Sequence, residues 1–93
     1  MSEAYRYVFS ENVLLEDVEA SLVLALFAVE SLHGEAQVRL DAAHTLDRQG
    51  RACVIDAGCP VGKDLNRVFV GFLRREFAPK EFQVERVCEE VCA

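Results

Sequence analysis

The sequence predicts a small α+β domain of the ferredoxin-like type, βαββαβ, with two helices packed on one face of a four-stranded antiparallel sheet. Three observations predict it. The chain has 93 residues, which is enough for one hydrophobic core and no second one. Its apolar residues alternate in some segments and recur every three or four residues in others. These segments follow one another as strand, helix, hairpin, helix, strand. We expect residues 1–87 to form this single domain and residues 88–93 a short acidic tail that contains cysteine.

The first half of the pattern is a strand followed by a helix. Tyr5–Phe9 is aromatic and β-branched with period-two alternation, which is typical of a strand. The stretch Leu15–His33 has apolar residues at spacings of three and four, which predicts an amphipathic helix. Acidic residues in its first turn suit the helix dipole. Gly34 is suited to end this helix.

A hairpin is expected next, over Glu35–Ala57. Apolar and polar residues alternate from residue 35 to residue 46, which predicts a half-buried strand. Asp47 and Gly50 stand where a turn that leads into a glycine bulge requires them. Arg51–Ala57 then returns as the third strand.

A second helix and a last strand complete the domain. Pro60 suits the first position of a helix, and Cys59 before it then occupies the N-cap. The apolar stripe of this helix ends before Pro79, and Phe82–Val87 alternates as the fourth strand.

The charge is acidic overall and unevenly distributed. Ten Lys and Arg face sixteen Asp and Glu, a net charge of −6. This balance disfavours nucleic acids and anionic membranes as partners, because both attract clustered cations. Residues 1–34 hold six acids and one base, whereas residues 58–80 hold five bases and two acids. The start of the chain shows no secretory signal, and no apolar run reaches the length of a membrane span. We therefore expect a cytoplasmic protein.

Four cysteines raise the alternative of a metal or redox function. They are Cys53, Cys59, Cys88 and Cys92. Their spacings lack the paired C-x2-C of zinc sites, so one tetrahedral site requires the tail to fold back over the 53–59 segment. Cys59 is also a candidate reactive thiol, because a helix N-terminus favours the thiolate. The simpler interpretation is a weak helix cap and no bound cofactor.

The segment from Gly58 to Asp64 resembles a phosphate-binding loop only superficially. It is one residue short of that motif and places Asp64 where the motif needs a hydroxyl. Lys63 and Arg67, one helical turn apart, remain candidate contacts for a small anion. A solvated helix start is the simpler alternative.

The first helix has more apolar surface than a monomer of this fold needs. Four apolar residues lie off its main stripe, namely Val23, Leu24, Phe27 and Ala28. An exposed apolar patch on a helix usually marks an interface. We therefore predict a small non-enzymatic interaction module that forms a homodimer or binds a protein partner, with cysteine-dependent metal binding or redox chemistry as the alternative.

Overall fold

A computed structural model describes residues 2–89 of the chain. It contains a four-stranded sheet, three α-helices and one 3₁₀ turn. In chain order the elements are β1 (Ser2–Phe9), α1 (Leu15–His33), α2 (Glu35–Asp41), β2 (His44–Asp47), β3 (Ala52–Asp56), α3 (Pro60–Glu76), η1 (Pro79–Glu81) and β4 (Phe82–Glu89).

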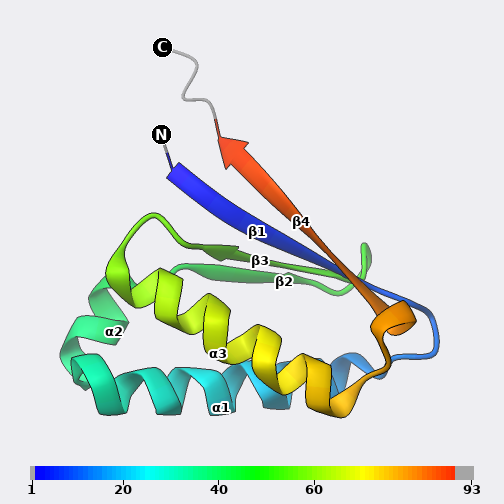
Figure 1. Ribbon diagram of the computed structural model, residues 1–93, viewed down its shortest axis with the longest axis horizontal. Coiled ribbons are helices and arrows are strands. Elements are labelled where there is room, and N and C mark those ends of the chain that lie inside the picture. Colours follow the sequence, from blue (N-terminus) through cyan, green and yellow to red (C-terminus); the bar gives the residue numbers. More distant parts are fainter. Residues whose placement is uncertain (1, 90–93) are drawn as a thin grey trace.

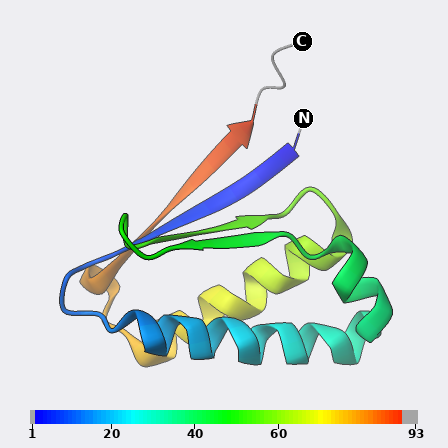
Figure 2. The ribbon, with the colours of Figure 1, turned by 180° about the vertical axis from the view of Figure 1, so that it is seen from behind.

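All neighbouring strands are antiparallel, and their order across the sheet is β2-β3-β1-β4. In the central strand, Tyr7 lies opposite Cys53 of β3 on one side and opposite Val84 of β4 on the other. The helices lie on one face of the sheet and leave the other face open (Figures 1 and 2). The predicted α+β class with a four-stranded antiparallel sheet is therefore confirmed.

The hydrophobic core lies between the sheet and the helices. From β1, Tyr7 and Phe9 point into it, and α3 contributes Leu65 and Phe69. The rings of Tyr7 and Phe69 meet edge to face, with centroids 5.0 Å apart. The apolar periodicity of the sequence therefore places large side chains from both layers in one core.

Helices α1 and α3 run antiparallel beside each other across this layer (Figures 1 and 2). Each buries one stripe at helical spacing, as the sequence predicts. Within residues 2–89, none of the helices combines the length and the hydropathy that a membrane crossing requires.

The predicted strand over residues 35–46 is wrong in its first part, where the chain forms the short helix α2. Gly34 separates α1 from α2 with φ of 86°, a conformation that glycine adopts without strain. Glu35 and Arg39 form an ion pair of 2.5 Å one turn apart. In α2 only Val38 is buried, while Leu40 is 80% exposed. The alternation was misleading because its apolar members do not share a buried face.

The predicted glycine bulge is also placed differently. Asp47 accepts a hydrogen bond from the backbone N–H of Gly50 at 3.0 Å, which confirms the turn. The residue with positive φ is Arg51, at 51°, rather than Gly50. The Arg51 guanidinium donates to the carbonyl oxygens of Ser10 and Val13, and these bonds hold the side chain in place.

Candidate interaction surface

The side of α1 that faces away from the sheet is apolar. Its buried stripe ends in Val29, and the opposite side presents an apolar ridge that consists of Ala20, Val23, Leu24 and Phe27. Val23, Leu24 and Phe27 are 43%, 57% and 59% exposed. The fourth predicted interface residue, Ala28, is half-buried beside the ridge. The prediction that large apolar side chains of α1 face solvent is therefore confirmed.

Acidic residues border the apolar ridge at both ends. An open hollow of about 610 Å³ lies at its N-terminal end, lined by Glu16, Glu19 and the first ridge residues. Glu19 forms an ion pair with Arg48 of the β2–β3 turn, whereas Glu16 is exposed in the first turn of α1. Glu30 follows the ridge toward the C-terminus and is half-buried. Any partner of the ridge therefore meets carboxylates at both of its ends.

Beside α1, helix α3 presents a basic face that consists of Lys63, Arg67 and Arg74. All three are exposed. The Arg67 side chain is 80% exposed, and its nearest carboxylate, Asp64, lies 4.0 Å away. So wide and exposed a pair contributes little stability, so the charge of Arg67 is available to a partner.

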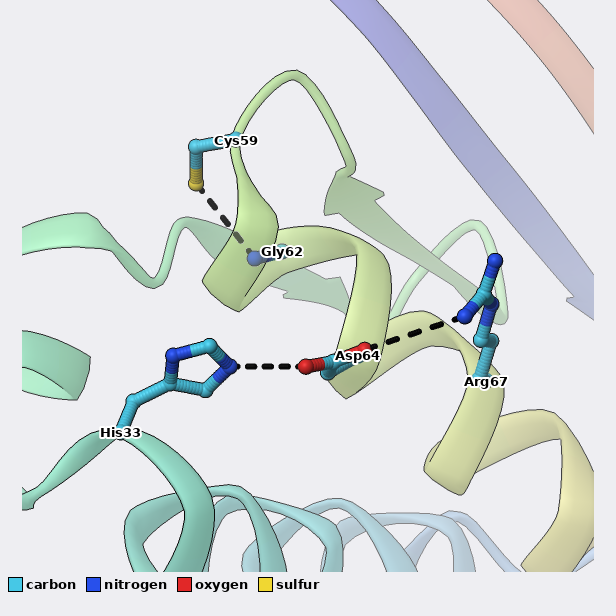
Figure 3. Close-up of polar contacts among 5 residues, drawn as sticks. All are labelled: His33, Cys59, Gly62, Asp64 and Arg67. Atoms are coloured by element: carbon cyan, nitrogen blue, oxygen red, sulfur yellow. Dashed lines mark hydrogen bonds and ion pairs between the residues drawn. The ribbon is translucent and has the colours of Figure 1, made fainter.

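A polar contact that the sequence does not reveal joins the two helices. His33 Nε2 in the last turn of α1 lies 2.7 Å from Asp64 Oδ2 in the second turn of α3 (Figure 3). The sequence does not identify this contact, because 31 positions separate the two residues. This pair fixes the C-terminal end of α1 against the N-terminal end of α3.

Cys59 occupies the N-cap of α3, as its position before Pro60 predicts. Its Sγ accepts a hydrogen bond from the Gly62 backbone N–H at 3.4 Å (Figure 3). The thiol also donates to the carbonyl oxygen of Asp41 at 3.5 Å, so it joins α2 to α3. These contacts give the half-buried thiol a structural role.

Of the other three predicted thiols, the structure describes only the side chain of Cys53. Cys53 is fully buried in β3, and this burial raises the pKa of its thiol to about 11. Such a thiol is a poor source of the thiolate that metal binding needs. The side chain of Cys88 and the whole of Cys92 lie outside the described residues. Among residues 2–89, no group of three or more His, Cys, Asp or Glu side chains is arranged to hold a metal ion.

The two candidate anion contacts line one pocket. Lys63 and Arg67 border a hollow of about 290 Å³, together with Glu3, Tyr5 and Asn66. Glu3 brings a carboxylate into the same hollow, where it accepts a hydrogen bond from the Tyr5 hydroxyl at 2.8 Å. That carboxylate opposes a bound anion, so the hollow is poorly suited to phosphate.

Comparison with known proteins adds no family. The chain matches no protein-family model, and a search of curated proteins gives no match either.

Proposed function

We propose that this protein is a self-association module, a homodimer formed by the helix layer. The exposed apolar ridge of α1 is the observation that supports it. Removing such side chains from water contributes roughly 25 cal/mol per Å² of apolar surface, so a partner surface would be strongly favoured there.

The distribution of charge supports a second copy as the occupant of the ridge. Helices α1 and α3 are antiparallel neighbours. A second copy can be related to the first by a two-fold axis that runs parallel to both helices and lies between them. This symmetry stacks α1 of each copy on α3 of the other. Glu16 then approaches Arg74 of the second copy, and Glu30 approaches Lys63 and Arg67. The same contact forms twice, as an isologous interface requires. The surface of one copy is thus complementary in charge to that of the next.

We also infer that the domain is a ferredoxin-like variant. The support is the strand order β2-β3-β1-β4 with helices on one face. Helix α2 is then an insertion between α1 and β2. This fold serves many functions, so the proposal of dimerisation depends on the surface and not on the topology.

The test is the molecular mass in solution. Sedimentation equilibrium of the wild-type chain should give a dimer. The double variant Val23→Glu/Phe27→Glu should be a folded monomer, because four buried carboxylates per dimer would each lack a partner. Leu40→Glu is the matched control, since Leu40 is more exposed than Val23, Leu24 or Phe27 but lies on α2. An unchanged mass in the double variant, with the same circular dichroism spectrum, would refute the proposal.

A charge exchange tests the two-fold arrangement itself. Glu16→Lys/Glu30→Lys and Arg67→Glu/Arg74→Glu should each weaken the homodimer, by about fivefold per reversed pair. An equimolar mixture of these two variants should form a heterodimer, because both α1–α3 contacts then join opposite charges. If each variant dimerises as well as the wild type, the stacking of α1 on α3 is wrong.

A further inference from the structure

Strand β4 is an edge strand whose outer side is unpaired within the described chain. The β1–β4 ladder continues to a hydrogen bond from the Ser10 N–H to the Glu81 carbonyl, 2.9 Å long. Backbone groups in an antiparallel ladder alternate in direction, so those of Gln83 and Glu85 point toward β1. The backbone groups of the alternate residues, Phe82, Val84 and Arg86, then point toward the free edge. This edge offers three successive residues for pairing with another strand.

The side chains of these residues lie on the helix side of the sheet, yet the helices do not cover them all. Val84 pairs with Tyr7, which is completely buried, but Val84 itself is 42% exposed. The reason is that β4 diverges from α3 toward its C-terminal end (Figure 1). An apolar side chain next to an open edge is a poor feature for an unpartnered strand.

A pocket lies at the start of this edge. It has a volume of about 370 Å³ and is lined by Arg74, Phe77, Pro79 and Phe82. Two rings and a proline make it mostly apolar. Arg74 brings a charge that pairs at 4.0 Å or less with no carboxylate among the side chains that the structure describes. Arg86 lies farther along the same side of this edge, and its Nε is 3.2 Å from Glu3. The edge thus combines a hydrophobic pocket with two guanidinium groups.

We propose that β4 binds an extended, acidic segment of a partner protein, which adds to the sheet as a strand antiparallel to β4. The backbone pairs with Phe82, Val84 and Arg86. An apolar side chain enters the pocket beside Phe82, and a carboxylate four residues earlier in the segment meets Arg86. Alternate residues project to the open face of the sheet and make little difference to the affinity.

A second copy of the chain is a poorer occupant of this edge. In a two-fold antiparallel pair of β4 strands, even-numbered residues of one copy must lie opposite even-numbered residues of the other. The backbone groups of these residues are the ones that point to the free edge. The two registers with the longest overlap place Glu85 opposite Glu85 of the second copy, or Arg86 opposite its Arg86. Like charges directly opposite each other destabilise a strand pair. The register centred on Val84 avoids this clash, but its overlap is limited to residues 82–86.

The probe is the fluorescein-labelled, C-amidated peptide Thr-Asp-Thr-Val-Thr-Leu-Thr. In the proposed register its Asp lies opposite Arg86, its Val opposite Val84 and its Leu opposite Phe82. Binding to the full chain is measured by fluorescence anisotropy. N-methylation of the Val should weaken binding by about tenfold, because that N–H points to β4. N-methylation of the Thr after it is the matched control and should change the affinity little, because that N–H points away.

Two protein variants complete the test. Val84→Arg should weaken peptide binding by about tenfold or more, because it places a cation against the apolar residue of the peptide. Arg86→Glu should weaken the Asp peptide and strengthen a peptide with Arg in place of Asp. Thermal unfolding followed by circular dichroism checks that both variants fold, and Glu85→Gln on the opposite face is the control.

The outcomes are distinct. Saturable binding that is lost on methylation of the Val alone supports the proposal, as does slower amide exchange at Val84 in the complex. No anisotropy change up to about 1 mM protein overturns it. Equal effects of the two methylations overturn strand addition. If Val84→Arg changes the molecular mass of the free protein, the edge is instead assigned to a second copy.

Discussion

Two buried side chains of neighbouring strands retain their protons at alkaline pH. Tyr7 of β1 and Cys53 of β3 lie opposite each other in the register, and both are inaccessible to solvent. Burial raises the pKa of the Tyr7 hydroxyl, and the nearby Cys53 and Tyr5 raise it further. Burial alone raises the pKa of the Cys53 thiol to about 11. The native state therefore binds these protons more tightly than the unfolded chain does.

We expect the free energy of unfolding to be highest below pH 9 and to fall as the pH rises toward 11. The unfolded chain loses the Cys53 proton near pH 9, whereas the native state keeps it until about 11. A group whose pKa is raised in the native state lowers the free energy of unfolding by about 1.4 kcal/mol per pH unit between its unfolded and its native pKa. Urea unfolding at pH 7, 9 and 10.5 measures it. Cys53→Ala should be less stable at pH 7 because it leaves a cavity, but its stability should depend less on pH.

The same measurement on Cys59→Ser is the control, because Cys59 is only half-buried at a helix start. If Cys53→Ala shows the wild-type dependence, the buried thiol is not the group that titrates.

At this scale the sequence predicts positions better than partners. Cys59 is recognisable as an N-cap because Pro60 follows it, and the structure confirms this role. The partner of His33 is not predictable, because Asp64 approaches it only after α1 and α3 have packed. Local geometry follows from neighbours in the chain, whereas ion pairs between elements follow from the tertiary fold.

At the scale of elements, the start of α3 lies unusually close to the end of β3. A Cβ atom on Gly62 would be 2.0 Å from the carbonyl oxygen of Asp56 and 3.2 Å from the Cα of Ala57. A backbone carbonyl cannot move aside as a flexible side chain could. Only glycine therefore allows the strand to turn directly into the helix at this point.

Gly62→Ala should destabilise the protein by about 3 kcal/mol or more, because the overlap forces α3 away from β3. Gly71→Ala is the matched control in the same helix. A Cβ atom at Gly71 meets nothing within 4 Å, so alanine should stabilise the protein there by about 0.5–1 kcal/mol. Chemical denaturation of both variants checks this. Equal effects of the two substitutions would show that helix propensity, and not the close approach, decides the outcome.

Element type is predictable where a long pattern coincides with burial. The apolar stripes of α1 and α3 are long enough to give one interpretation, and both helices are confirmed. Helix α2 has seven residues and one buried side chain, so its pattern holds little information. Its i,i+4 contacts, between Glu35 and Arg39 and between Gln37 and Asp41, stabilise a helix without any apolar period.

At the scale of the whole molecule, the two proposed interfaces lie mainly on different elements, α1 and β4, and have Arg74 of α3 in common. The ridge is on the outer side of α1, whereas the peptide site is at the far edge of the sheet, along β4 (Figure 2). The sequence predicts the ridge because helical periodicity shows which residues lie off the buried stripe. It does not predict the edge site, because that site depends on strand order and on the divergence of β4 from α3.

We expect substitutions that avoid Arg74 to affect the two interfaces independently. Val23→Glu/Phe27→Glu should be monomeric and still bind the peptide with wild-type affinity, whereas Val84→Arg should remain dimeric and lose the peptide. Combining all three substitutions should give additive changes, within about 0.5 kcal/mol, in sedimentation and anisotropy measurements. A monomeric variant that no longer binds the peptide would show that the edge site forms only in the dimer.

The pairing of β1 with β4 has a mechanical consequence. Ser2 lies opposite Glu89, so both ends of the described chain leave the domain at one corner, away from the helices (Figure 1). A pulling force applied through the two ends therefore acts across the ladder and not along it. The hydrogen bonds between β1 and β4 would open one pair at a time, like a zipper, and the peptide-binding strand would be the first part of the domain to yield under tension.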